Sequence, residues 1–377
     1  SCYSLQCSLI CSRTSVRNWI TVFNLIFCAL ELKILRVLID IGHPAHVHFF
    51  KNTIWSLHEK GNEVMVTSRD KEVTIDLLNA YGIPHNILTS TASDKGNVFK
   101  EWIVRDCKFL NVARKFNPDV LAGIINPCVA HASWVLRKKA FIFNDTEHQK
   151  FARKIINPFV EKVYTPSCFY EDFGKKQARY QGYHELAYLH PNRFSPNPAV
   201  LEEMGLKETD TIIILRFVSW KAHHDVGQAG IKNKAKLVNE LEKYGHVFIT
   251  SEQPLGPELD KYQIKVSPEK LHDLLYYATL YIGEGATTAS ECAVLGTHAV
   301  YVNTLRTGYT NEEESKYGLV FNFSEGQNME EEAFRKALDL LKNPNLKSEG
   351  RKKRNKLLKD KIDVTKFMVK EMENAIF

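Results

Sequence analysis

The chain has 377 residues, which is enough for two domains and too long for a single small module. Hydrophobic residues make up 44% and charged residues 25%, proportions that exclude a disordered, collagen-like or polytopic membrane protein. The net charge of +6 is local: residues 342–361 hold nine Lys or Arg and two Asp or Glu, a net +7, so the rest of the chain sums to −1. This distribution argues against a surface built to bind nucleic acid.

The cysteines and the N-terminal residues say little about function. None of the eight cysteines forms a C-x-x-C pair, which favours reduced thiols and a cytoplasmic location. In residues 1–33, Arg13 and Arg17 precede an apolar run from Trp19 to Leu30 that is too short to span a bilayer. We interpret residues 1–33 as a poorly ordered extension, a signal or interfacial anchor, or a start assigned too far upstream, and exclude them from the fold.

From Lys33 onward, short apolar runs alternate with helical patterns. This alternation predicts an α/β fold with a doubly wound parallel sheet. The first half predicts strands at 34–41, 63–68, 85–88, 119–124, 140–144 and 162–166 and helices at 47–60, 71–81, 98–116 and 128–136.

A cluster of Pro and Asn near residues 181–198 interrupts the alternation, which then resumes. The second half predicts strands at 211–217, 246–250, 263–266, 280–283, 298–303 and 319–323 and helices at 232–244, 268–277, 287–295 and 330–341. We therefore predict a first domain at 34–185, a hinge at 186–198, a second domain at 199–345 and basic helices at 346–377. Two such domains are expected to bind a ligand in a cleft beyond the carboxyl ends of their strands.

The first candidate site follows the first strand, in the segment 39–48, IDIGHPAHVH. Gly42 permits a tight turn before a helix whose N-terminus attracts anions. It matches neither a G-x-G-x-x-G fingerprint nor a P-loop. His43 is a candidate catalytic base, as an alternative to Asp145 below, and Gly42 and His46 are candidate substrate contacts. With His48, the two histidines could instead form a metal site, or they could cap and pack the helix.

The second candidate site is the segment 143–148, FNDTEH, at the end of a strand. Asp145 and His148 are candidates for acid or base catalysis, although Asp145 or Thr146 could simply cap a following helix. A third candidate, Arg216, ends the first strand of the second domain, where a guanidinium can pair with phosphate.

The fourth and most specific segment is 281–296, YIGEGATTASECAVLG. A glycine turn at Gly283 and Gly285 opens a helix of small residues, a pattern that lets a diphosphate approach the helix N-terminus. Thr287, Thr288 and Ser290 are candidate substrate-binding residues. Glu291 is placed to accept hydrogen bonds from ribose hydroxyls. The alternative is a tightly packed strand–helix unit with an exposed Glu.

These segments together resemble the GT-B superfamily of nucleotide-sugar enzymes, which includes glycosyltransferases and UDP-N-acetylglucosamine 2-epimerases. The segment Gly283–Gly296 resembles their donor-binding helix, and Glu291 falls on its ribose-binding position. From Lys33 to about Asn343 the chain is similar to a family of uncharacterised archaeal and bacterial proteins with this fold, on the motifs IDIGHPAHVHFFKN, FNDTEH, TPSCF, YHELAYLHP, DVG and KYGLVF.

The resemblance implies two facing Rossmann-like domains, an acceptor domain followed by a nucleotide-sugar domain, with a final helix returning to the first. Asp145 matches an acid of the epimerases, but a second acid of theirs falls on the segment 124–127, IINP, which has no carboxylate. We therefore expect a metal-independent glycosyltransferase with a nucleotide sugar as donor, an unknown acceptor and no other cofactor. The alternatives are a UDP-sugar 2-epimerase, a non-catalytic sugar-nucleotide-binding protein, and a metal-dependent hydrolase built on the three histidines.

The C-terminal residues carry the charge surplus. Residues 342–361 predict a basic amphipathic helix that either lies on an anionic membrane, near a membrane-borne acceptor, or presents a solvated face. The stripe of Val364, Phe367, Met368, Met372 and Ile376 predicts a last helix that needs an apolar surface. No feature of the sequence predicts the oligomeric state.

Overall fold

The computed structural model describes residues 34–90, 98–147, 154–218, 231, 233–251, 255–326 and 328–376. The predicted extension at residues 1–33 lies outside this range, as does the candidate residue His148. Residues 36–377 form one compact unit.

The first sheet has seven parallel strands in the order β3-β2-β1-β4-β5-β6-β7. The central strands are mostly apolar and buried along nearly their whole length, as expected for a parallel sheet covered by helices. The strands are β1 (Arg36–Ile41), β2 (Glu63–Asp70), β3 (Asn86–Ser90), β4 (Val120–Ile124), β5 (Lys139–Phe143), β6 (Val163–Pro166) and β7 (Gln177–Tyr180).

The second sheet has five parallel strands in the order β12-β11-β10-β8-β9. Its strands pack on a separate apolar core that includes Ile213, Leu215 and Ile282. The strands are β8 (Ile212–Phe217), β9 (His246–Ser251), β10 (Leu280–Gly283), β11 (His298–Val302) and β12 (Val320–Phe323).

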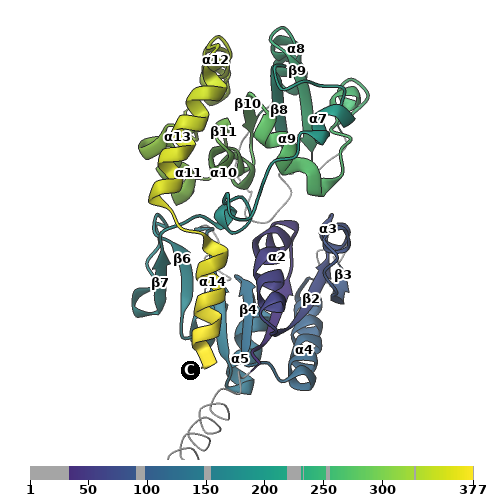
Figure 1. Cartoon of the computed structure of the whole chain (residues 1–377), viewed down its shortest axis with the longest axis vertical. Coiled ribbons are helices and arrows are strands. Elements are labelled where there is room, and N and C mark those ends of the chain that lie inside the picture. Colours follow the sequence, from purple (N-terminus) through teal and green to yellow (C-terminus); the bar gives the residue numbers. More distant parts are fainter. Residues whose placement is uncertain are drawn as a thin grey trace, which may run out of the picture. The chain divides into compact units, whose positions relative to one another are not determined.

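The helices connect and cover these strands (Figure 1). The helices of the first half are α2 (Pro44–Glu59), α3 (Thr74–Ala80), α4 (Val98–Phe116) and α5 (Pro127–Leu136). The helices of the second half are α7 (Ala199–Glu203), α8 (Lys234–Leu241), α9 (Leu271–Tyr277), α10 (Ala286–Leu295), α11 (Gly308–Glu312), α12 (Met329–Leu341), α13 (Leu346–Asp360) and α14 (Val364–Glu373).

Each sheet has a point where the chain reverses its direction of growth. In the first sheet this point lies between β1 and β4, and in the second between β8 and β10. Ligands of open α/β sheets bind beyond the carboxyl ends of the strands at such a point. The strand ends concerned carry Gly42, Ile125, Arg216 and Gly283, and Arg216 is the register partner of Gly283. The topology therefore favours the predicted site at both sheets.

The C-terminal helices confirm one expectation and refine another. The helix α14 packs against α2, with the Thr53 hydroxyl near the Met368 sulfur at 3.9 Å and an ion pair of 2.9 Å between Lys60 and Glu373. The predicted return to the first sheet is confirmed, and Figure 1 shows the two helices close together. The basic helix α13 does form, but several of its cations bond to backbone carbonyls of the protein itself.

Those carbonyls belong to helix ends. Arg351 donates to the carbonyls of Leu295 and Tyr276, and Arg354 donates to the carbonyl of Val294 at 2.8 Å. Lys353 donates to the carbonyl of Gly318 at 2.8 Å. Cations stabilise the negative end of a helix dipole. Part of the surplus charge therefore serves the fold, which leaves fewer cations for a membrane.

The structure differs from the predicted elements in several places. The strand β7 and the short helices α7 and α11 are absent from the prediction. Residues 263–266 do not form a strand, since only Gln263 makes an isolated bridge, to Ile249. The predicted hinge is not an exposed linker at its start, because residues 183–189 are all buried and include a short 3-10 helix, His184–Ala187. The domain boundaries themselves remain predictions.

Candidate functional site

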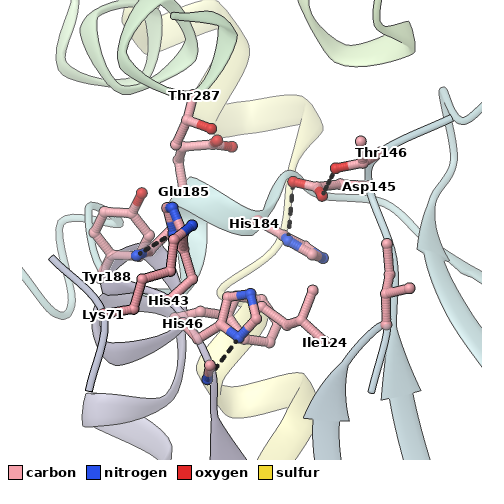
Figure 2. A pocket seen from close by; sticks show the side chains of 14 residues that line it. His43, His46, Lys71, Ile124, Asp145, Thr146, His184, Glu185, Tyr188 and Thr287 are labelled. Atoms are coloured by element: carbon pink, nitrogen blue, oxygen red, sulfur yellow. Dashed lines mark hydrogen bonds and ion pairs between the residues drawn. The ribbon is translucent and has the colours of Figure 1, made fainter. Parts of the chain in front are cut away.

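A cavity of about 310 Å³ lies at the carboxyl ends of β1, β2, β4 and β5 (Figure 2). Its wall also includes the buried segment 184–188 and the first turn of α10. The lining residues are Gly42, His43, Ala45, His46, Phe49, Lys71, Ile124, Ile125, Asp145, Thr146, His184, Glu185, Tyr188 and Thr287. The cavity is thus lined by residues from both halves of the chain, since Thr287 belongs to α10 in the second half.

His43 and His46 stand at the start of α2, and both serve the turn that Gly42 opens. The His43 Nδ1 accepts a hydrogen bond from the backbone N–H of Ala45 at 3.2 Å, which caps α2, so the capping role considered for this residue is confirmed. The His46 Nδ1 accepts from the N–H of Gly42 at 3.4 Å. Both rings therefore carry their proton on Nε2. Burial, assisted by the neighbouring His43, lowers the pKa of His46 to about 3, so this ring is neutral at pH 7.

His48 does not join these two histidines. Its ring packs against His272 and Tyr188, with centroid separations of 4.6 and 5.4 Å, and burial lowers its pKa well below the usual value. Among the described residues, no group of three or more His, Cys, Asp and Glu side chains is arranged to hold a metal ion. The hypothesis of a hydrolase whose metal is held by the three histidines is not supported by this geometry.

Asp145 and His184 form a buried pair in the cavity wall. The Oδ2 of Asp145 lies 2.9 Å from the Nδ1 of His184, and these side chains are 14% and 7% exposed. Burial alone would raise the pKa of Asp145, but its ion pair and hydrogen bond with His184 lower it, so the carboxylate is ionised. The Nε2 of His184 has no hydrogen-bond partner among the described residues. An imidazole oriented by a carboxylate, with its other nitrogen free, is the usual arrangement of a general base.

Glu185, the next residue, is a buried acid. It is 1% exposed, and neither of its carboxyl oxygens has a hydrogen-bond partner in the described chain. Burial raises its pKa well above the usual value, and the charges of Asp145 and Glu313 add to this effect. The side chain is therefore a neutral carboxylic acid facing the cavity.

The first turn of α10 contributes Thr287. Its N-cap residue is Gly285, and no side chain of the described residues caps it. A Cβ atom at Gly285 would lie 3.0 Å from Cδ and Nε of Arg216, and one at Gly283 would lie 2.8 Å from the Arg216 carbonyl oxygen. The two glycines therefore let Arg216 lie directly against the helix N-terminus. The positive charge of Arg216 also contributes to lowering the pKa of His43, after burial and Lys71.

The other predicted residues of α10 lie deeper. Thr288 is 7% exposed, and the hydroxyl of Ser290 donates to Oε1 of Glu313 at 2.6 Å. Glu291 is 5% exposed, and its Oε1 accepts from the hydroxyl of Tyr188 at 2.8 Å and lies 2.9 Å from Nε2 of His272. The carboxylate predicted to bind ribose is thus held by two side chains in this structure.

The strand end that lacks an acid is occupied by a buried network. Asn126 donates from Nδ2 to Oδ2 of Asp40 at 2.6 Å, and Arg105 pairs with the same oxygen at 2.6 Å. Beside it, Ile125 adopts a φ of 39°, a strained conformation for a β-branched residue. Such strain concentrates at functional sites. Ile125 lines the cavity, so the strained turn forms part of its wall.

A second cavity, of about 230 Å³, adjoins the first and shares Gly42, His46, Ile124 and Ile125 with it. Its arginines are paired, Arg69 with Glu101 at 2.7 Å and Arg105 with Asp40, and its acid Asp106 lies 2.7 Å from Nδ1 of His131. The remaining lining residues are Trp102, Asn126, Pro127, Cys128 and Ile155. The second cavity is therefore a separate space beside the first, and its lining side chains differ from those of the first cavity apart from the four shared residues.

The structure brings together several of the predicted site residues. Those that line the first cavity are Gly42, His43, His46, Asp145 and Thr287. Those that lie near it without lining it are Arg216, Gly283, Gly285, Thr288, Ser290 and Glu291. Sequence reasoning missed His184, Glu185 and Tyr188, although the motif YHELAYLHP that contains them had been singled out for the resemblance.

Solved structures of similar fold cover nearly the whole chain. A Listeria monocytogenes protein assigned as a UDP-N-acetylglucosamine 2-epimerase has a TM-score of 0.63 at 12% identity, covering 91% of this chain and 96% of that one. The forosaminyltransferase SpnP of spinosyn has a TM-score of 0.62 at 14% identity, covering 90% and 100%. The UDP-GlcNAc 2-epimerase of Neisseria meningitidis, bound to UDP-GlcNAc, has a TM-score of 0.57 at 14% identity, covering 90% and 99%. At these identities the likeness shows the GT-B fold alone.

Sequence comparison gives a relative and a family. The uncharacterized protein MJ0665 of Methanocaldococcus jannaschii is 23% identical over 288 residues, which are 70% of this chain and 80% of that protein. A family model described as "Protein of unknown function (DUF354)" matches residues 35–309. Since this match spans more than half of the chain, the protein belongs to the DUF354 family of GT-B-like proteins.

Proposed function

We propose that this protein is a glycosyltransferase that uses a nucleotide sugar as donor and needs no metal ion. The observation that carries the proposal is the first cavity, which is lined both by the paired base, His184 with Asp145, and by Thr287 in the first turn of α10. Transfer from a nucleotide sugar needs both parts: a base for the acceptor hydroxyl and positive or dipolar groups for the leaving diphosphate.

The donor's diphosphate is proposed to bind at the first turn of α10. The free backbone N–H groups and the helix dipole favour an anion there, and the hydroxyl of Thr287 adds a donor. Arg216 lies against Gly285 at the same helix end, which supplies a guanidinium for the phosphates. This charge is the reason to expect activity without a metal.

The acceptor is proposed to enter through the second cavity. Its shared wall with the first cavity, at Gly42 and His46, would lead an acceptor hydroxyl toward His184. Its arginines, Arg69 and Arg105, are neutralised by ion pairs with Glu101 and Asp40, and its remaining charged side chain, Asp106, is an acid, so the cavity suits an uncharged or apolar group better than an anion. An epimerase, which acts on the sugar of one substrate, needs no such second space.

The second candidate is a UDP-sugar 2-epimerase, favoured by the acidic groups around the first cavity. The strand end with Asn126 lacks a carboxylate, but Glu185 adds an acid to the wall from another part of the chain. Together with Asp145 and His184, it could move protons as that reaction requires.

The test is a turnover assay with a panel of nucleotide sugars, with and without alcohol acceptors and with chelator present. Transfer predicts release of nucleoside diphosphate that speeds up with an acceptor and does not change on chelation. Epimerisation predicts incorporation of solvent deuterium at carbon 2 of the sugar. Binding of a nucleotide sugar without turnover under any of these conditions would instead indicate a non-catalytic binding protein and refute both reactions.

A further inference from the structure

The Glu185 side chain has no role in the proposed transfer reaction, and it has no hydrogen-bond partner among the described residues. It is almost completely buried, yet it lines the cavity, and both of its oxygens lack a partner in the described structure. A buried polar group without a partner costs free energy, of the order of 1–3 kcal/mol. A side chain kept at that cost in a ligand-sized cavity is expected to gain its partner from the ligand.

The surroundings of Glu185 decide which form of the carboxyl group is present. The segment that carries it packs against α2, α10 and α14. The titratable groups around it are Asp145 at the end of β5, Glu291 on α10, Glu313 on the π-helix Glu313–Tyr317, His46 on α2, and the adjacent His184 and Tyr188. Three of these groups are acids, and α14 contributes the uncharged Thr365, which bonds to the Ala187 carbonyl. A second negative charge here would be repelled by the ionised Asp145 and would have no solvent to stabilise it.

The direction of the side chain identifies the part of the ligand that it would meet. In Figure 2 the carboxyl group of Glu185 is directed toward the first turn of α10, where Thr287 stands. This is the end of the cavity at which the proposed function places the diphosphate. A neutral carboxylic acid has one O–H donor, and phosphate oxygens accept only.

We propose that Glu185 is a neutral acid that donates its O–H hydrogen bond to the diphosphate of the bound donor. This proposal rests on the proposed function and adds a residue to it. During transfer the bond between sugar carbon 1 and the diphosphate oxygen breaks, and its electron pair stays on that oxygen. The acceptor oxygen forms the new bond to carbon 1, and its proton passes to Nε2 of His184. The O–H of Glu185 stabilises the negative charge that develops on the leaving diphosphate.

Isothermal titration with UDP tests this role in wild type, Glu185→Gln and Glu185→Ala, with uridine as the ligand that lacks phosphates. An amide N–H can replace the carboxyl O–H, so Glu185→Gln is expected to bind UDP within about twofold of wild type. Glu185→Ala is expected to bind UDP about tenfold or more weakly, because a hydrogen bond to a charged group is lost. Uridine affinity, measured by competition, is expected to be the same in all three.

Glu313→Gln is the matched control. Glu313 is also fully buried, and one of its oxygens has no hydrogen-bond partner within the part of the chain that the structure describes. It does not line the cavity, so this change is expected to leave UDP affinity unaltered. Thermal unfolding checks that each variant is folded. If Glu185→Ala does not fold, infrared difference spectra of wild type against Glu185→Gln decide: loss of a protonated-carboxyl band supports a neutral acid, and absence of such a band overturns it.

Two titration results would overturn the proposal while leaving the proposed function in place. If Glu185→Ala binds UDP as wild type does, Glu185 does not contact the diphosphate. If both Glu185 variants bind UDP more tightly than wild type, the carboxyl group is ionised and repels the ligand. If wild type binds no nucleoside diphosphate, both the proposed function and this role of Glu185 fail.

Discussion

Replacement of Asp145 by Asn tests the proposed base. The change keeps the shape of the side chain but removes the charge that faces Nδ1 of His184 at 2.9 Å. Because His184 is buried and the Asp145 side chain is only 14% exposed, water can replace little of that charge. Hydrogen bonds to charged groups contribute about 1.5–3 kcal/mol against about 0.5–1.5 for neutral ones. A difference of about 1–1.5 kcal/mol in the stabilisation of the protonated imidazole corresponds to about a tenfold lower kcat.

The assay is release of UDP from a UDP-sugar with water as the acceptor, which needs no knowledge of the natural acceptor. We expect Asp145→Asn to lower kcat about tenfold or more and to leave KM for the donor unchanged. Thr146→Val is the control, because the Thr146 hydroxyl donates to the other oxygen of Asp145, at 3.0 Å, and its loss leaves the pair with His184 intact. In ¹⁵N spectra at pH 8, His184 is expected to carry its proton on Nδ1. An unchanged kcat in Asp145→Asn, or a proton on Nε2 in wild type, would refute the reasoning.

Three further predictions concern the stability of the fold. Tyr188→Phe should lower the free energy of unfolding by about 1.5–3 kcal/mol, since Glu291 loses one of its two partners. Chemical denaturation measures this change. An unchanged free energy of unfolding would mean that the hydrogen bond of 2.8 Å between Tyr188 and Glu291 does not stabilise the fold. Burial raises the pKa of Glu313 to about 8, so between about pH 5 and 8 the unfolded chain releases a proton that the folded chain keeps, and stability should fall with rising pH. In Glu313→Gln this fall should be reduced by a few kcal/mol, and an identical pH profile would contradict the assignment. Arg354→Gln should destabilise the fold by about 1 kcal/mol, because its hydrogen bond to a helix end is lost. Lys352 is exposed, so Lys352→Gln should change the free energy of unfolding by less than about 0.5 kcal/mol. Equal effects of the two substitutions would argue against a structural role for the basic helix.

Hydrophobic periodicity was sufficient for most of the fold, because buried parallel strands and amphipathic helices have strong local patterns. The helix at 98–116 is predicted with both of its ends correct. The strand β7 was missed because its residues, QARY, are mostly polar and only half-buried at one edge of the sheet. The segment 263–266 has a strand-like pattern, but it finds no neighbouring strand with which to form a ladder beyond one bridge.

The site was predictable only where local sequence carries its chemistry. Glycine turns and helix starts marked Gly42, Gly285 and Thr287, because those features depend on adjacent residues. His184 and Glu185 could not be found in this way, since their burial depends on α2, α10 and α14, which are far away in the sequence. The Pro and Asn residues that follow them are typical of an exposed linker. The motif HEL alone does not reveal that the chain is buried here.

The most direct measurement of the central claim is a calorimetric titration of the wild-type protein with UDP and the other nucleoside diphosphates, in the presence of a chelator. The account predicts that at least one of them binds, and that Arg216→Ala, which removes the guanidinium beside the start of α10, weakens this binding about tenfold. If no nucleoside diphosphate binds, or if binding is unaffected by Arg216→Ala, the donor site proposed at α10 is contradicted.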